Sequence, residues 1–129
     1  MENKEFNISG IGQNVKTEAG SERQSDEGRG QPSLISPYLI RRLSKHMQKA
    51  TIKYKKGNWA KGQKFSRIID GIERHLIDYK LGEKKEDNLS AVVFGVMCLI
   101  HFEEVGREEE LNDLCELWGI NKPNHLKGE

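Results

Sequence analysis

A short segment rich in glycine and lysine, residues 57–64, holds the side chains best suited to bind a phosphate group. Phosphates bind to free backbone N–H groups near a helix start, helped by mobile positive charge. Lys61, Gly62 and Lys64 supply both directly before a predicted helix. Trp59 lies beside them, and stacking of a nucleotide base on such a ring contributes about 1–3 kcal/mol. The alternative is that Trp59 anchors the loop against the core and the lysines are solvated.

Acidic side chains on two neighbouring predicted helices form a second group that could carry chemistry. They are Asp70 and Glu73 on one helix, and Glu83, Glu86 and Asp87 ahead of the next. Carboxylate oxygens are the ligands that Mg²⁺ prefers, and a bound Mg²⁺ assists attack on a nucleotide phosphate.

Each of these acidic groups also has an ordinary structural interpretation. Asp70 can pair with Arg74 one helical turn later. The acids ahead of the next helix can cap its N-terminus without any metal. His75 is either part of the site or a histidine at the edge of the core.

The two cysteines, Cys98 and Cys115, lie inside apolar helical patterns, and no Cys-x-x-Cys or Cys/His ligand spacing occurs. This pattern argues against structural zinc and against a disulfide framework. It is typical of a protein of a reducing cytoplasm.

Hydrophobic periodicity predicts an all-α fold, a small bundle of about four helices, because apolar residues recur every three or four positions. A capping residue precedes two of the predicted helices and glycine follows them, as at helix ends in general. The predicted helices cover residues 37 to about 54, 66–80, 88–104 and 108–118. No strand is predicted.

The 129 residues amount to one domain. Residues 1–33 are polar and lack periodicity, which predicts a flexible N-terminal arm. We expect the helical domain at 34–119 and an irregular tail at 120–129. No signal peptide and no run of about eighteen apolar residues is present, so we expect neither secretion nor membrane insertion.

Charge is unevenly distributed along the chain. Residues 41–80 carry twelve basic and three acidic side chains, whereas residues 81–118 carry three basic and ten acidic ones. Such a chain can pair with itself, or it can place phosphate-binding and metal-binding groups on facing elements; solvated helix faces are the simpler alternative. The helix at 88–104 is apolar on nearly every side, which predicts a homo-oligomer. DNA binding is disfavoured, because the basic residues surround an acid-bearing helix.

Small or polar residues recur along the helix at 88–104, at Asn88, Ala91, Gly95 and Cys98. Such a stripe lets another backbone or a flat ligand approach closely. Tight packing against a neighbouring helix is the commoner reason for it.

Four motifs in order resemble a known family. They are Leu34-Ile35-Ser36-Pro37 with Arg41-Arg42-Leu43, Lys53-Tyr54 with Asn58-Trp59-x-Lys61-Gly62, Arg74-His75-Leu76, and Gly82-Glu83 with Glu86-Asp87-x-Leu89. Over about residues 23–105 the chain resembles the small phage and prophage domain called dATP/dGTP diphosphohydrolase, N-terminal. That family is regarded as related to the MazG-like all-α nucleoside triphosphate pyrophosphohydrolases. Those enzymes hold Mg²⁺ on acidic side chains, cut between the α- and β-phosphates, and are usually oligomers.

The resemblance implies a Mg²⁺-dependent pyrophosphohydrolase of purine deoxynucleoside triphosphates, with Mn²⁺ as a substitute, in the cytoplasm (that of the host if a phage encodes it). The implied catalytic residues are Asp70, Glu83 and Asp87, which together with Glu73 would bind the metal. The implied substrate-binding residues are Asn58, Trp59, Lys61, Lys64, Arg74, His75 and Asn88.

The chain departs from the family pattern at three places. Many relatives read Asp-His-Leu-Ala-His where residues 87–91 read Asp-Asn-Leu-Ser-Ala, so two histidines are absent. The usual Tyr-Gly pair is Tyr54-Lys55, and the Glu-Glu-x-x-Glu motif of MazG-like enzymes is replaced by residues 53–56, which include three lysines. The alternative function is therefore a catalytically silent module that sequesters a nucleotide or a cyclic-nucleotide signal.

Overall fold

The computed structural model describes residues 14–25 and 27–120, and the chain divides between Pro37 and Tyr38 into two compact units. Residues 1–13 of the predicted arm and 121–129 of the predicted tail lie outside the described residues. Among the helices of the described residues, none combines the length and the hydrophobicity that a membrane span requires.

The first unit contains a short antiparallel hairpin and one 3-10 turn. Strand β1 (Asn14–Lys16) pairs with β2 (Glu22–Gln24), with Val15 opposite Arg23. The turn between them is closed by a hydrogen bond from the Thr17 N–H to the Ser21 carbonyl, 2.7 Å long. The 3-10 turn η3 follows at Pro32–Leu34. The expectation that no strand forms was wrong here. All residues of the two strands are exposed, so their sequence shows no alternation of apolar and polar residues that would predict a strand.

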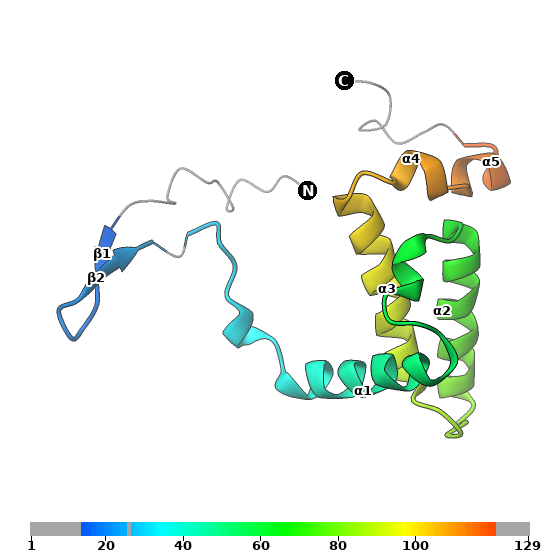
Figure 1. Cartoon of the computed structure of the whole chain (residues 1–129), viewed down its shortest axis with the longest axis horizontal. Coiled ribbons are helices and arrows are strands. Elements are labelled where there is room, and N and C mark those ends of the chain that lie inside the picture. The colour runs from blue at the N-terminus through cyan, green and yellow to red at the C-terminus, as the bar shows by residue number, and fades with distance from the viewer. Residues whose placement is uncertain (1–13, 26, 121–129) are drawn as a thin grey trace. The chain divides into compact units, whose positions relative to one another are not determined.

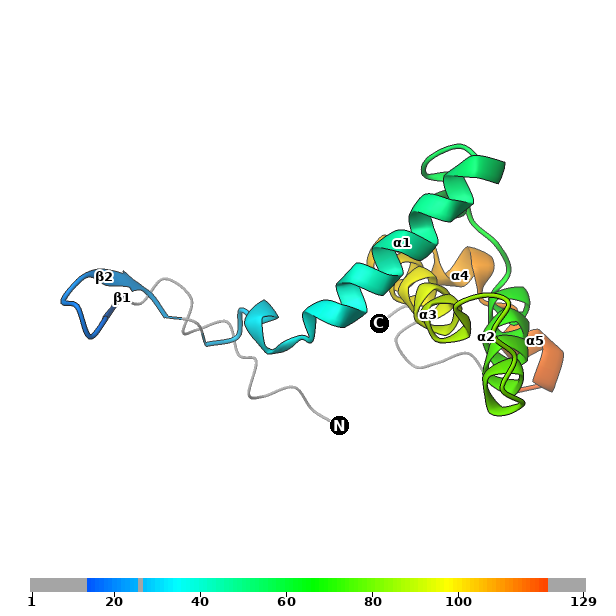
Figure 2. The ribbon, with the colours of Figure 1, turned by 90° about the horizontal axis from the view of Figure 1, so that it is seen from below.

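The second unit is all-α, which confirms the predicted fold class. Its elements are α1 (Pro37–Lys53), the 3-10 turn η4 (Asn58–Lys61), α2 (Phe65–Lys80), α3 (Asn88–Glu104), α4 (Glu108–Leu111) and α5 (Leu114–Trp118). Helices α2 and α3 lie side by side and run antiparallel, while α1 crosses near the start of α3 (Figures 1 and 2). Helices α4 and α5 lie at the other end of this pair (Figure 1).

The core lies where α2 meets α3, and its centre is Phe102, which is 1% exposed. The buried face of α3 is the stripe of small residues found in the sequence, and at Gly95 the side chain of Ile72 lies where a Cβ would be. Close helix packing is therefore the role of this stripe. The opposite face of α3 exposes Val96 and Ile100, at 42% and 56%. The homo-oligomer inferred from this apolar helix stays a prediction.

The segment predicted as one helix from Glu108 to Trp118 is two short helices, so that prediction was wrong. The chain turns at Asn112, whose side-chain oxygen accepts from the Leu114 N–H at 3.1 Å. The next residue, Asp113, accepts hydrogen bonds from the backbone N–H (2.9 Å) and the hydroxyl of Ser66. Asp113 thereby caps the start of α2, and the pKa of its carboxyl is lowered by those two bonds. A continuous helix would not place this carboxylate at α2.

Candidate functional site

The η4 turn is held against the core by an arginine from the start of α4. The Arg107 guanidinium donates to the Ala60 carbonyl at 3.2 Å and to both carboxylate oxygens of Glu110, at 2.8 and 3.0 Å. It also covers Gly62, which has a φ of 113° and no room for a Cβ. No local pattern in the sequence indicates this contact, because Arg107 lies 47 positions from Ala60.

Trp59 packs into the core from the same turn. Its ring meets His101 edge-on, with centroids 4.8 Å apart, and lies 6.3 Å from both Phe94 and Phe102. Trp59 therefore anchors the loop against the core, which is one of the two roles considered for it. The ring also lines a cleft beside the turn, so contact with a nucleotide base stays a prediction.

That cleft, which we call the basic cleft, lies between α1, the η4 turn, α2 and α3, and has a volume of about 570 Å³. Its polar walls carry His46, Asn58, Lys61, Arg67, Arg74 and His75. Apolar side chains, among them Ile68, Ile72 and Phe94, complete it. None of the described residues that line it carries a carboxylate, so the composition of the cleft suits an anion with an apolar part.

Five of the seven predicted substrate-binding residues line this cleft: Asn58, Trp59, Lys61, Arg74 and His75. Lys64 does not, because its ammonium group donates to the carbonyl of Glu110 at 3.2 Å. Asn88 is not part of this lining either, although its side-chain oxygen lies 3.0 Å from Nδ1 of His75.

Two basic residues of the cleft were missed in the sequence. Arg67 shares a face of α2 with Gly71 and Arg74, at intervals of four and three residues. A helical wheel of this segment would have placed Arg67 beside Arg74. His46 comes from α1, and local sequence carries no signal for it. Its ring lies 5.5 Å from that of Phe94, and burial lowers the pKa of its imidazole, which favours the neutral form.

Cys98 also lines the basic cleft, but it is not a nucleophile. Burial raises the pKa of its thiol to about 11, so the reactive thiolate is scarce near neutral pH.

The predicted acidic residues lie elsewhere and do not form one group. Glu83 and Asp87 line a second cleft of about 690 Å³, whose other charged residues include Arg42, Lys49 and Glu86. Asp70 and Glu73 are exposed on α2 and line neither cleft. In the described part of the chain no ion pair joins Asp70 to Arg74, and no three His, Cys, Asp or Glu side chains lie close enough to hold a metal ion. The four predicted ligands therefore do not fit a Mg²⁺ site in this arrangement.

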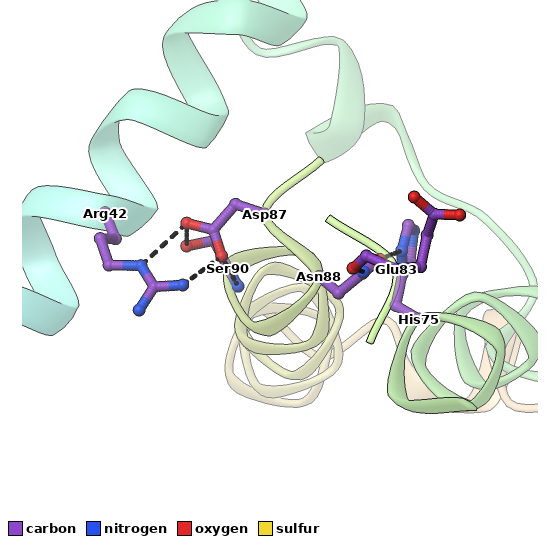
Figure 3. A network of polar contacts seen from close by, with 6 residues as sticks. All are labelled: Arg42, His75, Glu83, Asp87, Asn88 and Ser90. Carbon is purple, nitrogen blue, oxygen red and sulfur yellow. Dashed lines mark hydrogen bonds and ion pairs between the residues drawn. The ribbon is translucent and has the colours of Figure 1, made fainter. Parts of the chain in front are cut away.

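Both carboxylate oxygens of Asp87 accept hydrogen bonds from within the protein. One carboxylate oxygen accepts from Arg42 Nε at 2.9 Å and from the Ser90 hydroxyl at 2.7 Å. The other accepts from Arg42 Nη2 and from the Ser90 N–H at 3.1 Å. Asp87 thus caps α3 and ties it to α1 (Figure 3). These partners hold the pKa of the Asp87 carboxyl well below its usual range, the bond from Arg42 most of all.

Replacing Asp87 by alanine is expected to lower the free energy of unfolding by about 1 kcal/mol at pH 7, as the loss of an N-cap does. Because folding depresses the pKa, the charged form contributes its stability above the unfolded-state pKa near 4 and loses it as the pH falls below that value. The difference between wild type and Asp87→Ala should therefore shrink between pH 7 and pH 3, as followed by thermal melting. Asp70→Ala, on an exposed part of α2, is the control. A difference that stays constant over this range would contradict the capping role.

One of three comparisons with known proteins finds a match. No curated protein and no solved structure matches the chain significantly. A family model described as dATP/dGTP diphosphohydrolase, N-terminal, matches residues 19–112, which include strand β2, all of α1 to α4 and the residues that line the basic cleft. The family's name suggests a diphosphohydrolase of purine deoxynucleotides. The match covers well over half of the chain, and this protein therefore belongs to the dATP/dGTP diphosphohydrolase N-terminal domain family.

Proposed function

We propose that this protein binds a purine deoxynucleoside triphosphate in the basic cleft and hydrolyses it to the monophosphate and pyrophosphate. The observation that carries the proposal is the composition of the cleft: Lys61, Arg67 and Arg74 beside an apolar wall, with no carboxylate among the described lining residues. The family membership supplies the nucleotide class and the type of reaction.

The two kinds of wall suit the two ends of a nucleotide. A guanidinium group can donate two parallel hydrogen bonds to the oxygens of one phosphate. Lys61 adds a mobile positive charge from the η4 turn. A purine needs apolar surface and an aromatic edge, which Ile72, Phe94 and Trp59 offer. The cleft volume lies within the usual range for ligands of such size.

A second candidate function is sequestration of an intact nucleotide. What favours it is that the basic cleft holds cations while the predicted acidic residues lie outside its lining. A phosphate could thus be bound without the residues that were expected to assist its hydrolysis.

One experiment separates the two functions. The purified protein is incubated with each dNTP and NTP, with Mg²⁺, with Mn²⁺ and with a chelator, and every nucleotide is separated chromatographically before and after denaturation. Appearance of dAMP or dGMP with pyrophosphate supports hydrolysis. A nucleotide missing from the free pool but recovered intact after denaturation supports sequestration. Neither cleavage nor retention under any condition would refute both.

A further inference from the structure

Two hydrogen-bond acceptors lie next to Nδ1 of His75. Its Nδ1 lies 3.0 Å from Oδ1 of Asn88 and 3.4 Å from Oε1 of Glu86. The side chain is 28% exposed and lines the basic cleft. Figure 3 shows Asp87 and Asn88 at the start of α3 reaching in opposite directions, Asp87 toward α1 and Asn88 toward His75 on α2.

The Asn88 amide has only one orientation that satisfies both of its contacts. Asn88 is 3% exposed, and its Nδ2 donates to the carbonyl oxygen of Glu83 at 2.9 Å. The amide oxygen must then face His75, and an amide oxygen only accepts hydrogen bonds. The proton of a neutral His75 imidazole is therefore on Nδ1. The Glu86 carboxylate, also an acceptor near Nδ1, favours the same tautomer.

In this tautomer the free lone pair of the imidazole is on Nε2. Among the described residues no hydrogen bond occupies that atom. The ionised groups that line the cleft, Lys61, Arg67 and Arg74, can only donate hydrogen bonds. Nε2 of a neutral His75 can thus accept a proton, and His75 lines a cleft whose ionised side chains among the described residues are cations.

We infer that Asn88 is a positioning residue that fixes the Nδ1–H tautomer of His75, and that His75 Nε2 is the proton acceptor for the attacking water. The second part rests on the proposed hydrolysis. The water oxygen forms a bond to the α-phosphorus while one water proton passes to Nε2. The bond from the α-phosphorus to the bridging oxygen breaks, and pyrophosphate leaves with that electron pair. His75 then returns its proton to solvent.

The tautomer is tested without any nucleotide. Long-range ¹H–¹⁵N spectra of the full chain at a pH where His75 is neutral should show Nδ1 protonated and Nε2 unprotonated. Asn88→Ala should produce a mixture of tautomers, whereas Asn88→Asp, which keeps an acceptor, should restore the wild-type pattern. His46 serves as the internal control and should not change. A wild-type spectrum with the proton on Nε2 overturns the positioning role, whatever the protein does to nucleotides.

The catalytic part is tested by steady-state kinetics on the purine dNTP that the wild type cleaves. His75→Gln should lower kcat about a hundredfold or more with little change in KM, as loss of a general base does. Asn88→Ala should lower kcat about tenfold, and Asn88→Asp should recover most of it. Thermal melts identify a variant that does not fold, and in that case Asn88→Asp and His75→Gln carry the test.

The outcomes remain distinguishable from failure of the proposed function. If the wild type hydrolyses dNTPs and His75→Gln keeps its kcat, His75 is not the acceptor although the proposed function stands. If the wild type cleaves nothing, the hydrolysis and the catalytic role of His75 both fall. The role of Asn88 is then decided by the spectra alone.

Discussion

Changing Arg74 to glutamate is expected to weaken the binding of a non-hydrolysable dATP or dGTP analogue about a hundredfold or more. Arg74 lines the basic cleft, and a charge-assisted hydrogen bond from it to a phosphate contributes about 1.5–3 kcal/mol. The variant loses that bond and places a negative charge beside the triphosphate. Together the two effects should weaken the binding free energy by about 3 kcal/mol, which is two orders of magnitude in Kd. Isothermal titration calorimetry at fixed ionic strength measures the change.

Arg41→Glu is the matched control for this variant. It makes the same charge change on α1, where Arg41 lies over the ring of Tyr38 and lines neither cleft. Only long-range electrostatics should act there, and these are weak beyond about 8–10 Å at physiological salt. Equal losses of affinity in the two variants would show that the nucleotide does not bind in the basic cleft.

Substitution of Gly95 by valine is expected to destabilise the protein by about 3 kcal/mol. The Cβ of any residue at this position would collide with the side chain of Ile72 across the α2–α3 contact. Overpacking of a core costs about 1–3 kcal/mol, and a β-branched side chain here reaches the upper end of that range. Urea unfolding followed by circular dichroism gives the free energy of unfolding.

Two further variants isolate the collision as the cause. Gly71→Ala replaces a helical glycine with open space around it, so it should be neutral or stabilising by up to about 1 kcal/mol. Ile72→Ala removes the Cγ1 and Cδ1 atoms that lie in the way of a side chain at position 95. It should therefore be less destabilising in the Gly95→Val background than in the wild type, which a double-mutant cycle detects as coupling. Independent, additive effects of the two substitutions would argue against this close contact.

The helices were predictable because their signals lie within a few residues of one another. Pro37 marks the start of α1, Asp87 caps α3 and accepts from Ser90 three residues later, and Gly82 follows α2 with a φ of 77°. The predicted bounds of α1, α2 and α3 agree with the structure to within a residue or two. The break at Asn112 was missed, since the stripe of Leu111, Leu114 and Trp118 continues across it and resembles one helix.

The candidate site was only partly predictable. The loop with Trp59 and Lys61 and the helix with Arg74 and His75 were identified from residue types, and the structure brings these four into one cleft. The predicted acidic residues were expected near the basic loop, but none of them lines the basic cleft. Proximity along the chain does not decide which side of a helix start a side chain takes, as Asp87 and Asn88 demonstrate (Figure 3).

The all-α class, the three long helices, the Asp87 cap of α3 and the chemical character of the η4 turn could all be predicted from the sequence alone. These depend on interactions within about four residues, which a linear pattern records. Three contacts could be found only in the folded chain: Arg42 pairs with Asp87, Asp113 caps α2, and Arg107 holds the η4 turn. The partners in these contacts are 45 to 47 positions apart. Such pairs form where the packing of helices brings distant segments of the chain together, and no local pattern encodes which side chains then meet.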